Sequence, residues 1–162
     1  TRIIKPGTTF MDNTKTRRAL SREENVNRLV CERVQRIIED TTHVVLLLTD
    51  YVEHVEALAE KLANLKTKVF RAGEPADFES GTRVFIGTHT YAKEGLDISQ
   101  ISMLFLVTPP SRNVEQTLGR LRQPKGERAA AEVIELRTGI LAYKHLQNYY
   151  KQKSWKVQMK SF

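Results

Sequence analysis

Two arginines near a glycine, close to residue 120, have the types and spacing that best suit chemistry on an anion. The segment 113–123 reads N-V-E-Q-T-L-G-R-L-R-Q. If it is helical, Gln116 and Arg120 share one face, and Gly119 lets a backbone or a ligand come close. A guanidinium grips phosphate oxygens with forked, bidentate geometry. The segment therefore suits an anionic target such as a triphosphate.

The second arginine, Arg122, points away from Arg120 in a continuous helix. Pro124 disfavours helical geometry at the residue before it, so the helix should end near Arg122 and let that side chain turn beside Arg120. Taken alone, the pattern is more typical of a surface helix with solvated arginines. The rest of the chain has to decide between the two.

The composition favours a partner that carries negative charge. The chain has 162 residues, 40% of them hydrophobic, with 26 Lys and Arg against 19 Asp and Glu, and a formal net charge of +7. These values suit one globular domain, 1–162, and make nucleic acid the first partner to consider. Because the chain opens on Thr1 rather than Met, we expect it to belong to a longer polypeptide.

The single cysteine and the hydropathy exclude several classes of protein. Cys31 is alone, so an internal disulfide and a cysteine-based zinc site are both excluded, and we expect an intracellular, reducing compartment. The longest apolar run, residues 44–48, is too short to span a bilayer, and no signal peptide pattern is present. We therefore expect no membrane partner and no metal site.

Short apolar runs alternate with helical patterns along the chain. Ser21 and Glu24 read as a capping box that opens a helix. We predict a lead-in at 1–20, helices at 21–39, 52–64 and 140–150, strands at 43–48, 66–70, 83–87, 101–107 and 129–136, and an edge strand or tail at 151–162. This alternation predicts an α/β fold, with an open, mostly parallel sheet and flanking helices. Ligands of such folds lie beyond the carboxyl ends of the strands.

Three segments resemble, in the family's order, motifs of superfamily 2 helicases. Residues 87–98, G-T-H-T-Y-A-K-E-G-L-D-I, resemble motif V, residues 113–123 resemble motif VI, and residues 44–62 resemble the motif IV strand and its helix. The resemblance covers about 21–150 and implies a RecA-like C-terminal motor domain. In detail the chain is most similar to phage and large-DNA-virus helicases, such as the poxvirus and African swine fever virus transcription helicases.

The resemblance implies catalytic roles for the residues of motif VI. Arg120 and Arg122 would be arginine fingers on the γ-phosphate of ATP, and Gln116 would couple closure of the motor to the nucleotide. Many family members carry the second arginine where this chain has Gln123, whereas the Dicer branch has the G-R-x-R spacing found here. Arg122 therefore matches the spacing of the Dicer branch, while Arg120 matches both patterns.

Gly95, Asp97 and Gly119 would form the nucleotide-binding part contributed by this domain. The resemblance places Gly95 and Asp97 near the ribose and the interface between motor domains, although Asp97 has the alternative of capping a helix or turn. The pattern G-x-x-x-x-G-K-[ST] is absent from the chain. ATP and Mg²⁺ would thus be held mainly by an N-terminal RecA-like domain of the same polypeptide, and this chain alone should be inactive.

Nucleic acid would be held at the strand ends. The resemblance matches Thr88 to the motif V threonine, and Thr49 has a comparable position after the first strand. Both have the alternative of capping a helix. Tyr91 and Lys93 would extend this surface, while His89 is interpreted as a loop or core residue.

The function that best fits is an ATP-dependent nucleic-acid helicase or translocase, represented by its C-terminal motor domain. A non-catalytic RecA-like scaffold that binds a partner protein is the alternative. A dinucleotide-dependent oxidoreductase fits the α/β pattern but needs G-x-G-x-x-G, which the chain lacks. DNA and RNA stay equally open. If the protein is viral, we expect it in the host cytoplasm and possibly in the virion.

Overall fold

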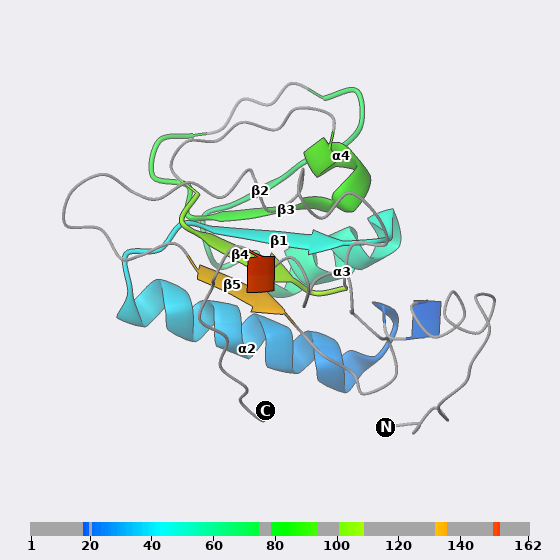
Figure 1. Ribbon diagram of the computed structural model, residues 1–162, viewed down its shortest axis with the longest axis horizontal. Coiled ribbons are helices and arrows are strands. Elements are labelled where there is room, and N and C mark those ends of the chain that lie inside the picture. Colours follow the sequence, from blue (N-terminus) through cyan, green and yellow to red (C-terminus); the bar gives the residue numbers. More distant parts are fainter. Residues whose placement is uncertain are drawn as a thin grey trace.

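A five-stranded sheet with the helices α2, α3 and α4 makes up most of the described part of the molecule (Figure 1). The computed structural model describes residues 18–19, 21–74, 79–93, 101–108, 132–135 and 151–152. In chain order the elements are α2 (Glu24–Asp40), β1 (Val45–Thr49), α3 (Val52–Lys61), β2 (Thr67–Val69), β3 (Val84–Thr88), α4 (His89–Lys93), β4 (Met103–Leu106) and β5 (Glu132–Glu135).

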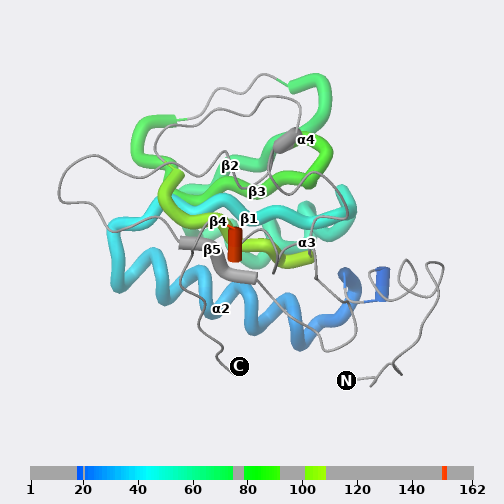
Figure 2. Tube along the Cα trace, in the orientation of Figure 1, coloured from blue at the N-terminus to red at the C-terminus, as the bar shows by residue number. Residues whose placement is uncertain are grey.

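The strands make one parallel sheet in the order β2-β3-β1-β4-β5. Figure 2 traces the path, from α2 in blue through β1 in cyan to β3 in green. After β1 the chain moves to one side of the sheet to make β2, and after β4 it moves to the other side to make β5. The connections diverge between β1 and β4, so this pair is the topological switch point, where open α/β sheets bind ligands. The predicted α/β fold with a parallel sheet is confirmed.

The central strand β1 reads V-L-L-L-T and is buried along its whole length. A strand covered on both faces needs a continuous apolar run of this kind, because its side chains alternate between the two faces. Val45 and Leu47 join the core cluster that faces the helices, whereas Leu46 and Leu48 belong to the opposite face.

Helices α2 and α3 cover one face of the sheet. Val30, Val34 and Ile37 on α2 are buried at i, i+4 and i+7, and Val55 and Leu58 on α3 are buried at i and i+3. This spacing gives each helix a single apolar stripe, which packs on β1, β3 and β4 in one core cluster. Complete burial of a side chain such as Leu58 stabilises the fold by about 1.5–3 kcal/mol.

The predicted capping box is wrong. Helix α2 begins at Glu24 with Glu23 as its N-cap, and no side chain caps it. The hydroxyl of Ser21 instead donates to the carbonyl oxygen of Arg18 at 2.7 Å, so it closes the turn that precedes the helix. Short hydroxyl side chains compete for local backbone groups in this way.

The predicted strands and helices agree with the structure within a few residues where they fall in its described part. Most of the lead-in, the helix predicted at 140–150 and the tail lie outside the described residues, so the domain limits 1–162 stay a prediction. Among the described residues, no helix combines the length and the apolar character needed to cross a membrane.

Candidate functional site

Three threonines lie where β1, β3 and β4 end. Thr49 is the last residue of β1, Thr88 is the last of β3, and Thr108 follows β4 by two residues. Thr49 pairs with Thr88 in the parallel register, and the hydroxyl of Thr108 donates to that of Thr49 over 3.5 Å. Polar side chains thus meet at the carboxyl edge, on both sides of the switch point.

The buried imidazole of His54, on α3, hydrogen-bonds side chains of β1 and α2 at this edge. His54 Nδ1 lies 2.5 Å from Thr49 Oγ1, and His54 Nε2 lies 2.8 Å from Asn27 Oδ1 on α2. The Asn27 amide nitrogen donates to the Ser21 carbonyl oxygen at 3.3 Å, so Oδ1 is the acceptor toward His54. His54 therefore donates through Nε2 and accepts the Thr49 hydroxyl at Nδ1.

The protonation state of His54 agrees with this pattern. Burial lowers its pKa from 6.5 to about 4, and the Asp50 carboxylate opposes that shift only in part. The ring is neutral at pH 7. A neutral imidazole has one donor and one acceptor nitrogen, which is what Asn27 and Thr49 require.

The exits of β3 and β4 are joined across β1. The Thr88 hydroxyl accepts the backbone N–H of Tyr91 at 3.2 Å and so caps the first turn of α4. His89, the first residue of α4, is buried, and its Nε2 donates to the carbonyl oxygen of Thr108 at 2.6 Å. The start of α4 is thereby fixed against the segment that follows β4.

Tyr91 extends a ladder of aromatic rings at the same edge. Its ring lies parallel to that of Phe70, with 5.1 Å between the centroids, and Phe70 lies parallel to Phe85 at 5.5 Å. Phe85 is fully buried and Phe70 nearly so, whereas Tyr91 is only partly buried. Tyr91 is therefore held by stacking on the core, at the boundary with solvent.

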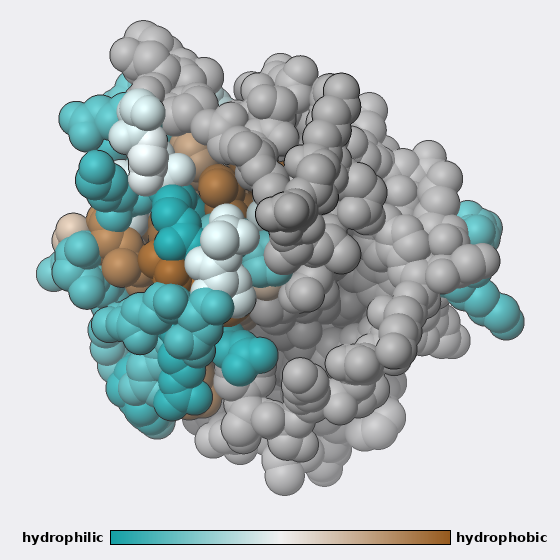
Figure 3. Space-filling view, turned by 90° about the vertical axis from the view of Figure 1, so that its left-hand side faces the viewer, coloured by the Kyte–Doolittle hydropathy of each residue, from teal (hydrophilic) through white to brown (hydrophobic). Residues whose placement is uncertain are grey.

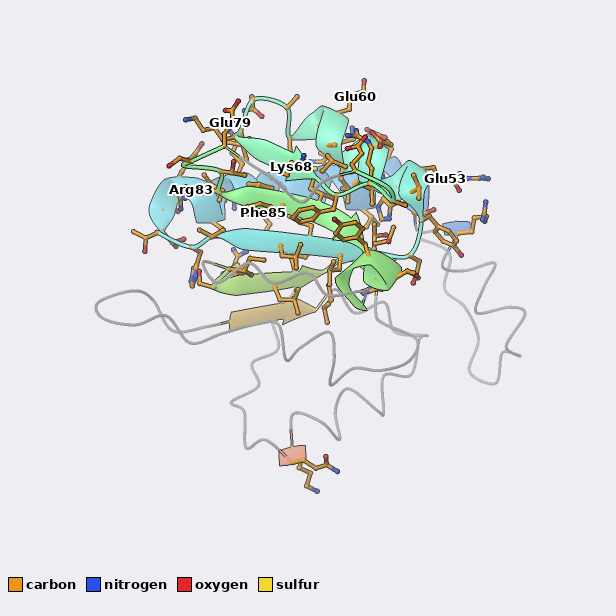
Figure 4. The ribbon with its side chains drawn as sticks, turned by 90° about the horizontal axis from the view of Figure 1, so that it is seen from above. Glu53, Glu60, Lys68, Glu79, Arg83 and Phe85 are labelled. Atoms are coloured by element: carbon orange, nitrogen blue, oxygen red, sulfur yellow. The ribbon has the colours of Figure 1, made fainter. Side chains whose placement is uncertain are left out.

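The N-terminus of α3 carries charged residues at this edge. The Arg18 guanidinium lies 4.6 Å from the centre of the Tyr51 ring and 3.0 Å from Glu53 Oε1. Figure 4 shows Glu53 toward the carboxyl ends of the strands and Arg83 toward the opposite ends. Because Arg18 and Glu53 are both about half exposed, their ion pair contributes little stability.

This chain resembles known proteins in its fold. No protein-family model matches it, and no curated protein does. Solved structures do match: the C-terminal domain of the DEAD-box protein Dbp5 has a TM-score of 0.62 at 14% identity, covering 81% of this chain and 79% of that one. The fold is that of a RecA-like helicase C-terminal domain.

Two longer proteins share this RecA-like fold. T4 UvsW gives a TM-score of 0.60 at 13% identity, with 80% of this chain and 28% of that one covered. The C-terminal part of the Fun30 ATPase domain gives 0.58 at 12% identity, with 82% and 46% covered. This chain therefore spans less than half of these two structures. At such identities the likeness establishes the fold and leaves function to the site.

Of the sequence-predicted nucleic-acid residues, Thr49 is placed differently from the expectation. Its side chain is fully buried, because it continues the face of β1 that packs against the helices, and its hydroxyl is engaged with His54. It does not cap α3 either, whose N-cap is Tyr51 with no side-chain hydrogen bond. Thr49 thus supports the RecA-like edge from inside and offers no surface to a ligand.

Thr88 and Tyr91 lie at the exit of β3, as predicted, and Thr88 also caps a helix, which was its stated alternative. The backbone of Lys93 ends α4 at the same edge. Gln116, Arg120 and Arg122, with the nucleotide residues Gly95, Asp97 and Gly119, lie outside the described residues, so their roles stay predictions.

Sequence reasoning missed His54 and Asn27. Asn27 lies three residues before Val30, and His54 lies four residues before Leu58, so both fall on the apolar stripes of their helices. A polar residue inside an apolar stripe signals a buried hydrogen bond, and that signal was present. In the described part of the chain, no group of three or more His, Cys, Asp or Glu side chains is placed to hold a metal ion.

Proposed function

We propose that this chain is the C-terminal motor domain of an ATP-dependent nucleic-acid helicase or translocase of superfamily 2. One observation carries the proposal. The segment 87–98, which resembles motif V, begins at the end of β3 beside the switch point of a RecA-like sheet, and the segment 113–123, which resembles motif VI, follows β4. Motif V thus starts at the edge where such a sheet binds ligands, and motif VI follows in sequence a strand that ends at that same edge, which supports one shared site.

The proposed chemistry is that of an arginine finger. Arg120, with Arg122 beside it, would neutralise charge that develops on the γ-phosphate. Gln116 would couple closure of the cleft to the bound nucleotide. Gly95, Asp97 and Gly119 would line the part of the nucleotide site that this domain supplies. A first motor domain of the same polypeptide would bind the remaining phosphates of ATP and the Mg²⁺.

The proposed nucleic-acid surface consists of the exit of β3. Thr88, Tyr91 and Lys93 lie on one short segment that the structure holds by a cap, a stacked ring and the His89 bond to Thr108. Thr88 would contact a phosphate with its hydroxyl, Lys93 would add charge, and Tyr91 would contact a base or a sugar. The net charge of +7 favours the same partner.

We propose further that the parent enzyme is of the phage and large-DNA-virus type, on the sequence resemblance alone. Such an enzyme would act inside the host cell. DNA and RNA are equally compatible with phosphate contacts of this kind, because these contacts do not read the bases.

The proposal is tested in the longer polypeptide that includes the first motor domain, by steady-state ATPase assays with saturating nucleic acid. Arg120→Ala should lower kcat by a factor on the order of 10³ or more, with a much smaller effect on ATP binding. Arg120→Lys should not restore the rate, because an ammonium lacks the forked contact.

The matched control is Arg36→Ala, which removes an exposed arginine of α2. It should leave kcat unchanged, and neither alanine variant should change the free energy of unfolding by more than about 0.5 kcal/mol. A well-folded Arg120→Ala enzyme with near-normal kcat would refute the assignment of motif VI.

A further inference from the structure

A connected set of buried polar side chains runs beneath the switch point, and the proposed function leaves it unused. Asn27, His54, Thr49 and Thr108 are each no more than 2% exposed, within an otherwise apolar layer. They come from α2, α3, the end of β1 and the residues after β4.

Stability alone does not account for this set. Apolar side chains of similar shape would fill the same space without any need for partners, whereas a buried polar group without its partner is costly. The hydrogen bonds are specific in direction, because Thr49 donates to His54 Nδ1 and His54 Nε2 donates to Asn27. These hydrogen bonds instead fix the positions of the side chains at the two ends of the set, Asn27 and Thr108.

One end of the set lies at the site. Thr49 bonds Thr108, the last residue described before the segment that carries motif VI, and the carbonyl of Thr108 accepts from His89 at the start of α4. The other end lies on α2, where Asn27 donates to Ser21. His54 therefore connects Asn27 on α2 to Thr49 at the end of β1, and through Thr49 to Thr108 after β4.

We propose that His54 is a positioning residue that fixes the exits of β3 and β4 relative to each other through the Thr49 hydroxyl. This proposal rests on the proposed function in one respect, because the proposed function assigns nucleic acid to the exit of β3 and the arginine fingers to the segment after β4. Loss of the His54–Thr49 bond then weakens the effect of nucleic acid on ATP turnover. It leaves both binding surfaces in place.

Two substitutions at position 54 separate positioning from packing. His54→Gln retains a donor where Nε2 lies, so it keeps the bond to Asn27 and loses the acceptor for Thr49. His54→Asn retains an acceptor where Nδ1 lies, so it keeps the bond to Thr49 and loses the donor to Asn27. If His54 were only filling space, the smaller Asn would be the more harmful change.

The first measurement uses this chain alone and does not depend on any activity. Amide NMR spectra should show shifts at Thr108 and His89–Tyr91 for His54→Gln, at least threefold larger than for His54→Asn. His43→Gln is the control, because His43 bonds Ser102 at the opposite edge and should shift residues near Val44 and Ser102 instead. Equal shifts from the two His54 variants, or larger ones from His54→Asn, would overturn the proposal.

The second measurement is the ratio of kcat with saturating nucleic acid to kcat without it, in the longer polypeptide. His54→Gln should reduce this ratio about tenfold with the basal kcat and the KM for ATP unchanged within twofold, and His54→Asn should retain it. A ratio that His54→Gln leaves unchanged would overturn the role in coupling. An unmodified enzyme with no stimulation would refute the proposed function, while the spectra would still decide whether His54 positions the two exits.

Discussion

The two ends of the parallel sheet use polar residues in different ways. At the amino edge, Arg83 donates to the carbonyl oxygens of Ile38, Thr41 and His43, and Ser102 accepts the backbone N–H of Val44. At the carboxyl edge, His54 is bonded to the side chains of Thr49 and Asn27. At the amino edge most of these bonds join a side chain to backbone, and His43 with Ser102 is a side-chain pair. At the carboxyl edge Asn27, His54, Thr49 and Thr108 form a connected series of side chains from four segments, in addition to bonds to backbone.

This difference follows from what the edges have to do. The carbonyl oxygens at the end of α2 need donors, and Arg83 supplies them to Ile38 in the last turn and to the C-cap residue Thr41, where a cation is also favoured by the helix dipole. Figure 3 looks onto this edge and shows hydrophilic residues around a small apolar area. At the carboxyl edge, the imidazole of His54 bonds two side chains and, within the described residues, no backbone carbonyl oxygen that needs a donor. We therefore interpret the amino edge as structural and the carboxyl edge as functional.

The largest expected effect is the loss of stability at low pH that is caused by His54 at the carboxyl edge. The folded state holds His54 neutral down to a pKa of about 4, while the unfolded chain protonates near 6.5. The contribution of neutral His54 to the free energy of unfolding is complete above pH 6.5. It is lost as the pH falls toward 4, because the unfolded chain binds the proton at a higher pH than the folded one. The loss should be about 3 kcal/mol in the free energy of unfolding.

Denaturant titrations between pH 7 and pH 4 measure this loss. His54→Asn should flatten the pH dependence, whereas Val55→Ala, the adjacent core change, should lower stability by a similar amount at every pH. An unchanged slope in His54→Asn would show that the imidazole is not held neutral.

At the amino edge, Arg83→Met should destabilise the fold by about 2 kcal/mol, because it removes charged hydrogen bonds to carbonyl oxygens while it keeps most of the apolar stem. Nucleic-acid affinity, corrected for the folded fraction, should not change. The measurement is a pair of denaturation and binding curves. A loss of affinity in fully folded Arg83→Met would place function at the amino edge as well.

Sequence reasoning reached the sheet because its signals are local and strong. The run at β1 is apolar without interruption, and the stripe of α2 keeps a clear helical period, so both were predicted within two or three residues. Tertiary partners are harder to predict. Thr49 was expected to contact nucleic acid or to cap a helix, whereas its side chain is buried and its hydroxyl bonds His54, which comes from a separate helix.

The smallest expected effect concerns single charges. Lys93→Ala at the carboxyl edge should lower the slope of log affinity against log salt by roughly 0.7–0.9, the value for one phosphate contact. Lys66→Ala, which removes a lysine that precedes β2 at the amino edge, should leave the slope unchanged. Titrations of the chain with single-stranded oligonucleotide at several salt concentrations give both values. Equal changes from the two variants would mean that nucleic acid binds by charge alone.

Hydrogen exchange of this chain, with and without single-stranded oligonucleotide at low salt, tests most directly which edge is functional. We predict slower exchange in peptides that contain residues 88–93 and 107–108, with residues 41–44 and 82–84 unchanged. Protection confined to 41–44 and 82–84, with none at the exits of β3 and β4, would contradict the account.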